Sequence, residues 1–451
     1  MLEDINALSG TILTLLDAKD YPQLRDLLVS INEVDIAHLF ENLPSEKLPL
    51  LFRLLPKEEA AESFVEMDGD MQELLIRGIS DNELKEVLDE LYLDDAVDIV
   101  EEMPANVVKR ILANTDPDTR KMINEILKYP EDSAGSIMTI EYVSLRPFMT
   151  VADSIKRIRR TGVDKETIYT CYVTDDSRHL LGVIDVKTLL LTEEDALIND
   201  LMQTNVIRVK TLDDKELVAN NFNIYSLLSM PVVDEENRLV GIVTVDDAIE
   251  VLTEEATEDI KKMAAILPSE KPYLKLTPVD LWKARIPWLL LLMISATFTS
   301  SIIASFQDAL QASLVLTACI PLLMDTCGNA GSQASVTIIR SISLGEISFH
   351  DVCRVVLKES SVALLCGITL AAANFIKLLL FDKLTVMVAL VICLTILVAV
   401  FAAKIVGCLL PLITKALGFD PAVMASPFIT TIVDALSLLV YFRIATILLH
   451  L

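Results

Sequence analysis

The last apolar segment, from Met424 to Leu449, contains the run Ser426-Pro-Phe-Ile-Thr-Thr-Ile-Val-Asp434-Ala-Leu-Ser-Leu-Leu-Val-Tyr-Phe442. Because about 20 apolar residues suffice to cross a bilayer, the segment is predicted to be a membrane-spanning helix. A carboxylate near the middle of such a helix is costly unless a partner, water or a cation faces it. Asp434 therefore predicts either an ion pair with a neighbouring helix or a cation site that lines a pore. The hydroxyls of Thr430 and Thr431 favour the pore.

Four other apolar segments precede this one in the last third of the chain. They cover residues 286–306, 310–339, 355–380 and 384–412. Trp282 and Trp288 flank the start of the first, and tryptophan commonly anchors helices at the membrane surface. The sequence therefore predicts five membrane spans.

The predicted topology follows from the start of the chain and from its loops. Residues 1–20 have acids among their apolar residues and no basic region, so we expect no secretory signal and a cytoplasmic N-terminal half. Arg340 and Arg354 lie between the second and third spans and Lys358 at the start of the third, and basic residues of this kind are enriched in cytoplasmic loops. Five spans then place the C-terminus outside, in a multi-pass protein of the cytoplasmic membrane.

Charge divides the chain into two parts. The 451 residues carry a net charge of −27 and are 52% hydrophobic. Residues 1–275 hold 56 acidic and 28 basic side chains, whereas residues 276–451 hold 9 and 10. A region this acidic would repel nucleic acid, which is therefore not an expected partner, and would attract cations. Of the seven cysteines only Cys171 lies outside the apolar part, and no metal-ligand spacing occurs, so neither disulfides nor a zinc site is predicted.

Residues 1–133 show the pattern of a small all-helical domain. Short amphipathic stretches are separated by prolines at positions 44, 56 and 104, each of which is a helix-start signal. In one stretch Asp94 and Asp98 are four residues apart and therefore share a helix face. A solvated acidic surface is the simple interpretation, and a divalent cation bridging to another acidic surface is the functional one.

Residues 134–252 contain an internal repeat in which each copy is predicted to run strand, helix, strand, turn, strand, helix. The second copy includes Leu239-Val-Gly-Ile-Val-Thr-Val-Asp-Asp247. This region resembles a tandem pair of CBS domains, which often hold an adenine nucleotide between the copies. ATP is therefore an expected ligand on the resemblance alone, because no phosphate-binding glycine loop occurs here.

The segment after the repeat is predicted to be an acidic helix that leads into the membrane. Glu250, Glu254 or Glu255, and Glu258 fall at a spacing of three to four residues, so their carboxylates gather on one side of the helix. Carboxylate oxygens suit Mg²⁺ or Ca²⁺. A solvated acidic helix without a metal is the alternative.

The second predicted span is interrupted by glycines and small polar residues. It contains Gly328-Asn329-Ala330-Gly331-Ser332-Gln333. Small residues allow helices to approach closely, and polar groups at such a position can coordinate a cation or its hydration water. The density of polar groups favours a pore lined by Gly328, Asn329, Ala330 and Gln333.

Taken together, these motifs resemble the MgtE family of magnesium transporters over nearly the whole chain. The resemblance implies a multidomain membrane protein: a helical N domain (1–133), an α/β CBS pair (134–252), a connecting plug helix (253–282) and a transmembrane domain of five helices (283–451). It implies a homodimer in the lipid bilayer, with a pore between spans two and five of both subunits and Asp434 meeting hydrated Mg²⁺.

The resemblance also implies that cytoplasmic Mg²⁺ bridges the acidic surfaces and closes the pore. The residues at matching positions are Asp94, Asp98, Asp214, Glu216, Asp247, Glu255, Glu258, Asp259 and Asp420. Two positions depart from the family pattern, because Asn223 and Glu250 stand where some relatives have aspartate. The number of regulatory ions therefore does not carry over, and Glu250 stays a candidate ligand.

Two opposite charges fall inside predicted spans. Asp325 lies in the second span and Lys404 in the fourth. Because each is costly alone in a membrane, we predict that they form an ion pair.

The sequence thus predicts a magnesium channel or transporter that is not an enzyme and is closed by cytoplasmic Mg²⁺. One alternative keeps the fold and changes the ion to Co²⁺ or Mn²⁺. Another is a CBS-regulated membrane sensor that conducts nothing. An intramembrane protease is disfavoured, because the histidines of the apolar part, His350 and His450, lie outside or at the edge of spans.

Overall fold

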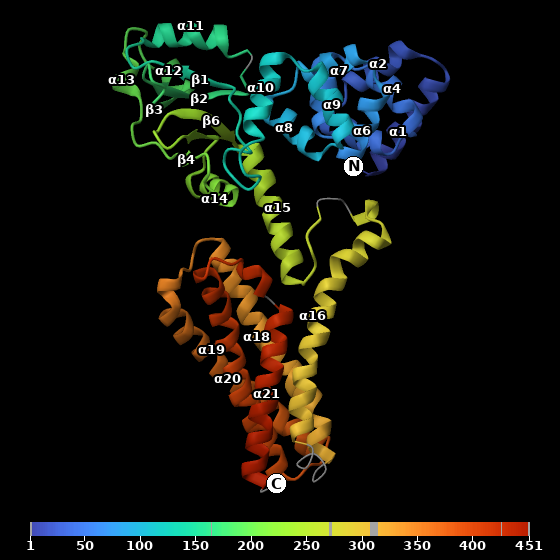
Figure 1. Cartoon of the computed structure of the whole chain (residues 1–451), viewed down its shortest axis with the longest axis vertical. Coiled ribbons are helices and arrows are strands. Elements are labelled where there is room, and N and C mark those ends of the chain that lie inside the picture. Colours follow the sequence, from blue (N-terminus) through green and yellow to red (C-terminus); the bar gives the residue numbers. More distant parts are fainter. Residues whose placement is uncertain (1, 164, 270–272, 307–313, 425, 450–451) are drawn as a thin grey trace. The chain divides into compact units, whose positions relative to one another are not determined.

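The computed structural model describes residues 2–163, 165–269, 273–306, 314–424 and 426–449 (Figure 1). The chain forms two compact units, residues 1–252 and 253–451. Each unit has its own apolar core.

The N-terminal part of the first unit is helical, as predicted. Its core includes Phe40, Phe64 and Leu75, all fully buried. Pro44, Pro56 and Pro104 each occupy the position just before a helix, which confirms the predicted helix starts. The helices are α1 (Leu2–Asp17), α2 (Tyr21–Val29), α3 (Glu33–Glu41), η1 (Ser45–Lys47), α4 (Leu48–Phe52), α5 (Lys57–Val65), α6 (Gly69–Gly78), α7 (Asp81–Leu88), α8 (Leu93–Glu102), α9 (Ala105–Asn114) and α10 (Pro117–Ile126).

The repeat forms two similar α/β copies. The first contains β1 (Tyr142–Leu145), α11 (Val151–Thr161), β2 (Thr167–Thr174), β3 (Leu180–Asp185) and α12 (Val186–Leu191), followed by α13 (Ile198–Leu201). The second contains β4 (Val209–Lys210), α14 (Lys215–Tyr225), β5 (Ser229–Val233), β6 (Leu239–Thr244) and α15 (Val245–Met263). In each copy a parallel strand pair is followed by an antiparallel hairpin. The predicted order of elements is confirmed.

The two copies are joined through their buried faces. The hydroxyl of Tyr172 lies 2.6 Å from the hydroxyl of Ser229, and both residues are buried. The hairpin turns also pair, because the Leu180 amide donates to the Asn237 carbonyl and the Leu239 amide donates to the Arg178 carbonyl. These contacts hold the copies in one fixed arrangement.

The second unit is built from long helices that lie side by side (Figure 1). They are α16 (Pro278–Ser305), α18 (Leu314–Ser343), α19 (Val352–Leu380), α20 (Val386–Ala416) and α21 (Ser426–Leu449). Short 3-10 turns cover Tyr273–Lys275, Phe349–Asp351 and Pro421–Met424. By length and apolar composition, four of the described segments can span a membrane: Pro278–Ser305, Phe349–Leu380, Val386–Ala416 and Phe428–Leu449.

Helix α18 is the predicted second span, although the first residues of that prediction, 310–313, lie outside the described residues. Its length, from Leu314 to Ser343, is sufficient to cross a bilayer. Its polar motif lowers its hydropathy, and its apolar face packs with α20 and α21 in the core of the unit. Helix α20 supplies many of the buried residues of this core, as its small and apolar side chains allow.

Candidate cation sites

Asp434, the carboxylate predicted to line a pore, lies in the second unit where α18 and α21 meet. A Cβ atom added to Gly328 would lie 3.6 Å from Asp434 Oδ1 and 3.1 Å from Thr430 Cγ2. The hydroxyls of Ser332 and Thr430 are 3.4 Å apart across the same contact. Asp434 Oδ1 is buried and has no hydrogen-bond partner among the described residues. This contact therefore joins the two polar motifs of the predicted second and fifth spans.

The glycines of α18 have different neighbours. A Cβ on Gly407 of α20 would come within 2.3 Å of the Gly331 carbonyl oxygen, so this crossing depends on close backbone approach. At Gly328 the neighbours of such an atom are the methyl group of Thr430, at 3.1 Å, and Oδ1 of Asp434, at 3.6 Å. Close packing thus accounts for Gly331, and at Gly328 it brings α18 against Thr430 with the Asp434 carboxylate in contact beside it.

One face of α18 carries polar side chains along its length. Asp325, Asn329, Gln333 and Thr337 follow one another at intervals of four residues, and all are exposed. Of the predicted pore residues, Asn329 and Gln333 lie on this face, which we name the α18 polar stripe. Ala330 instead lies in the apolar core, with 7% of its surface exposed.

The predicted ion pair between Asp325 and Lys404 is wrong. Lys404 is 5% exposed, and its Nζ lies 3.8 Å from Oε2 of Glu359 on α19. Asp325 lies on the polar stripe and accepts a hydrogen bond of 3.2 Å from the Asn329 amide. The prediction paired the two conspicuous charges and overlooked Glu359, an acid inside the third predicted span, which faces α20.

An acidic cluster lies within the first unit, between the helical domain and the CBS pair. Asp94 of α8, Glu166 before β2 and Asp247 of α15 each place a carboxylate oxygen within 4.8 Å of the other two. Asp247 Oδ2 accepts hydrogen bonds from the hydroxyl and amide of Thr244, which fix its orientation. The structure thus brings together Asp94 and Asp247, as predicted candidates, and adds Glu166.

Burial raises the pKa of the three carboxylates of this cluster and of Asp95 and Asp98 beside it. Desolvation, followed by repulsion from Asp94, raises the pKa of Asp98 to about 8. The same two causes raise the pKa of Asp95 to about 7 and raise that of Asp247. Burial also raises the pKa of Asp94 and of Glu166. Without a cation, Asp98 and Asp247 therefore hold protons at neutral pH, and a divalent ion would take the place of those protons.

Glu250 lies close enough to Asp98 to raise its pKa by repulsion, so this predicted ligand also belongs near the cluster. Asp214 has a local role, because it accepts a 2.8 Å hydrogen bond from the Glu216 amide. It is the N-cap of α14, a position that aspartate commonly occupies. Asp214 and Glu216 lie outside the three-carboxylate set.

A second group of predicted ligands lies in the other unit, where α15 ends beside the loop before α21. Here Lys262 Nζ is 2.8 Å from both Glu258 Oε1 and Asp420 Oδ2. Asp259 accepts a 3.1 Å hydrogen bond from Ser343 at the end of α18, and burial raises its pKa. Lys262, which lies four residues after Glu258 and was left out of the prediction, thus neutralises two of these acids. A metal bridge at this place stays a prediction.

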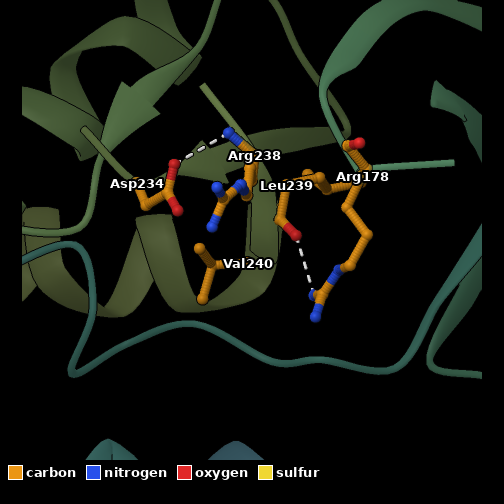
Figure 2. A pocket seen from close by; sticks show the side chains of 6 residues that line it. Arg178, Asp234, Arg238, Leu239 and Val240 are labelled. Carbon is orange, nitrogen blue, oxygen red and sulfur yellow. Dashed lines mark hydrogen bonds between the residues drawn. The ribbon is translucent and has the colours of Figure 1, made fainter. Parts of the chain in front are cut away.

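A hollow of about 440 Å³ lies where the two hairpin turns of the CBS pair meet, and Figure 2 shows Arg178 and Arg238 beside it. Arg178 donates a 2.8 Å hydrogen bond to the Leu239 carbonyl. Arg238 pairs with Glu236. Sequence reasoning missed this feature, although an acid begins both turns.

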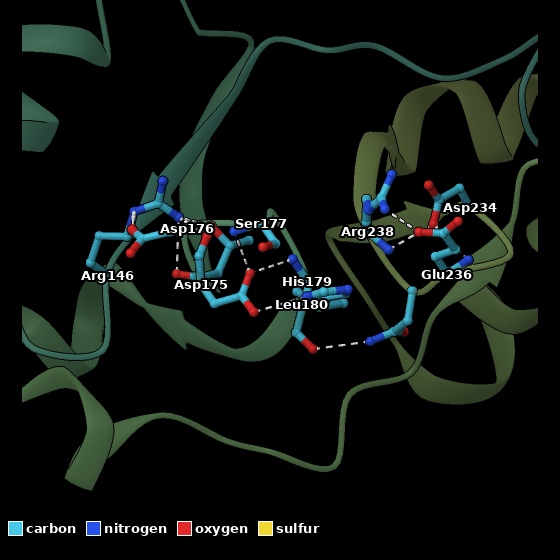
Figure 3. Close-up of polar contacts among 11 residues, drawn as sticks. Arg146, Asp175, Asp176, Ser177, His179, Leu180, Asp234, Glu236 and Arg238 are labelled. Atoms are coloured by element: carbon cyan, nitrogen blue, oxygen red, sulfur yellow. Dashed lines mark hydrogen bonds and ion pairs between the residues drawn. The ribbon is translucent and has the colours of Figure 1, made fainter.

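The two turns have the same construction (Figure 3). Asp175 Oδ1 accepts from the amides of Ser177 and His179 at 2.9 and 2.8 Å. Asp234 Oδ1 accepts from the amides of Glu236 and Arg238 at the same two distances. These carboxylates therefore fix the shape of the two turns.

Comparison with known families gives three matches along the chain. A model described as a divalent cation transporter, MgtE, matches residues 320–444. The MgtE intracellular N domain matches residues 31–132, and the CBS domain matches residues 134–193 and 198–254.

Two similar proteins match over nearly their full length. The chain is 36% identical to the magnesium transporter MgtE of Thermus thermophilus over 435 residues, which cover 96% of each chain. It is 30% identical to the magnesium transporter MgtE of Bacillus subtilis over 443 residues, 97% of this chain and 96% of the other. A solved structure, the cytosolic domain of the Mg²⁺ channel MgtE in complex with ATP, is 36% identical with a TM-score of 0.52, and covers 54% of this chain and 99% of that one.

Proposed function

This chain belongs to the MgtE family of magnesium transporters, and from that premise we propose how its own residues conduct and sense Mg²⁺. It is a multi-pass membrane protein that transports Mg²⁺. The observation that carries the rest of the proposal is the buried oxygen of Asp434 beside Gly328, which has no hydrogen-bond partner among the described residues. A carboxylate placed in this way is costly unless a cation or water faces it.

In this proposal Asp434 holds the ion through its hydration shell. Mg²⁺ loses water reluctantly and usually binds one or two carboxylates while keeping several waters. Asn329 and Gln333 of the polar stripe supply amide groups that hydrogen-bond to such waters. In a homodimer two Asp434 side chains face one path, so that two negative charges balance one divalent ion.

The acidic cluster is the proposed sensor of cytoplasmic Mg²⁺, with the helical domain and the CBS pair in the cytoplasm and the C-terminus outside. Asp94, Glu166 and Asp247 would hold the ion, and the charge of the ion would replace protons that the buried carboxylates otherwise need. Since a ligand that binds one arrangement better shifts the population towards it, occupied clusters favour a closed pore. Without the ion the carboxylates take up protons and no longer share a bridging charge, so the closed arrangement loses its advantage and the pore opens. No enzymatic step is needed.

We also propose that the CBS pair binds an adenine nucleotide. The support is the ATP complex of the similar cytosolic domain and the two α/β copies that this chain shares with it. The nucleotide would add to the control of the pore by Mg²⁺.

Binding of Mg²⁺ to the full-length protein at pH 7 is expected to release protons. Asp98 has a pKa of about 8 without the ion, so it is mostly protonated at pH 7, and the pKa of Asp247 is raised in the same direction. A bound cation favours the ionised form and lowers both values. The proton and the ion compete, so apparent affinity should fall as pH falls from 8 to 6. Calorimetric titration in two buffers of different ionisation enthalpy measures the proton count.

The matched control is Glu83→Gln, in the helical domain that also contains Asp98. A hydrogen bond from Arg53 lowers the pKa of Glu83 to about 2, so this group has no proton to release at pH 7. We expect Asp247→Asn to reduce proton release and Glu83→Gln to leave it unchanged. Equal release from both variants, or an affinity independent of pH, would remove the cluster from the proposal.

A further inference from the structure

The correction at Lys404 leaves Asp325 as a membrane carboxylate whose role needs a different explanation. Lys404 forms an ion pair with Glu359. Asp325 is exposed on α18 and accepts a hydrogen bond from the Asn329 amide. An ionised group on a membrane helix persists where it faces water, a cation or a charged partner. An exposed position on the polar stripe fits water or a cation.

The stripe places Asp325 beside the carboxylate already assigned to transport. Asp325 precedes Gly328, the contact point of Asp434, by three residues, which is close to one helical turn and about 5 Å along the axis. The two carboxylates are near enough for Asp325 to act on Asp434 electrostatically. The Asn329 amide holds the Asp325 side chain along the stripe.

We propose that Asp325 is a second cation-binding carboxylate of the transport path, which holds hydrated divalent ions one helical turn from Asp434. This inference rests on the proposed function, in which Asp434 lines that path. Two carboxylates in succession give a divalent ion two sites of similar chemistry, as conduction requires. They also favour a doubly charged ion over a singly charged one, because Coulomb attraction scales with the charge.

The direction of α18 gives the order of the two sites. Its last residue, Ser343, donates to Asp259 of α15, the helix that is proposed to lead from the cytoplasm. Asp325 lies about five helical turns from that end, and Gly328 lies nearly one turn closer to it. An ion that enters from outside therefore meets Asp325 first and Asp434 second.

The test is Mg²⁺ uptake by liposomes that contain the full-length Asp325→Asn variant, with external Mg²⁺ varied and cobalt hexammine added as a rigid mimic of the hydrated ion. We expect half-saturating Mg²⁺ to rise about tenfold, block by cobalt hexammine to weaken by a similar factor, and flux at saturating Mg²⁺ to fall less. Asp382→Asn is the control, since it removes an acid of the same unit that pairs with Lys377 at the end of α19. Asp325→Glu keeps the charge and should stay close to wild type.

The outcomes separate this inference from the function on which it rests. Unchanged flux in Asp434→Asn would overturn the proposed function. Loss of flux in Asp434→Asn together with wild-type half-saturation and block in Asp325→Asn would overturn the role of Asp325 alone. If Asp325→Asn does not fold, Asp325→Ser is compared with Asp325→Glu. Equal half-saturation in these two would likewise contradict the inference.

Discussion

Replacing Asp434 by asparagine is expected to reduce Mg²⁺ flux at least a hundredfold while the protein stays folded. The substitution keeps the shape of a side chain that lies against Gly328 and Thr430 and removes its charge. In a dimer it removes both charges that face the ion. A hundredfold loss corresponds to about 2.7 kcal/mol, which is modest for the interaction of a divalent ion with two carboxylates in a partly dehydrated path.

The same variant should be at least as stable as the wild type. A buried carboxylate oxygen without a hydrogen-bond partner costs free energy, and the neutral amide costs less. We therefore expect an unchanged or higher unfolding temperature in detergent, measured beside flux into liposomes loaded with a Mg²⁺ indicator. Flux above half of the wild-type rate in a folded Asp434→Asn protein would contradict the assignment of this residue.

Replacing Lys404 by methionine is expected to destabilise the membrane unit by about 3–5 kcal/mol. The ammonium group lies between α19 and α20, and the side chains of Lys404 and Glu359 are only 6% and 14% exposed. Methionine fills the space of the lysine stem but leaves Glu359 as an uncompensated charge among apolar residues. Thermal unfolding of the purified protein measures the loss.

The double variant Lys404→Met with Glu359→Gln identifies the cause. Removing both charges should restore most of the stability, because the penalty lies in the unpaired charge. Lys377→Met is the control, since its partly exposed pair with Asp382 should contribute at most about 1 kcal/mol. Additive losses in the double variant would show that the two groups do not act as a pair.

Local sequence signals predicted the helices and the repeat, and they singled out Asp434 as the candidate pore carboxylate. Prolines before amphipathic stretches mark the starts of helices in any context, because their geometry acts on neighbouring residues. The repeated strand and turn pattern defined the two α/β copies in the same local way. Asp434 was identified because an ionisable residue within an apolar span is costly unless a charged partner, water or a cation faces it.

Contacts that depend on the rotation of one helix against another were not predictable. Lys404 pairs with Glu359 because the rotation of α19 and α20 about their own axes brings these side chains together. Glu359 and Asp325 are both acids within spans, and the sequence does not show which of them faces Lys404. Glu166 was missed since it lies between a helix and a strand, far in sequence from Asp94 and Asp247. Lys262 was missed because the acids around it were interpreted as metal ligands. Its spacing of four residues from Glu258 is nevertheless that of an ion pair on one helix face.

The most direct test is Mg²⁺ flux through the purified wild-type protein in liposomes, with the ion on the face of residues 1–252 either depleted or raised to millimolar levels. We predict rapid flux when that face is depleted and suppression when Mg²⁺ is restored there. A folded wild-type protein that passes no divalent cation even with that face depleted would contradict the proposed transport and its control.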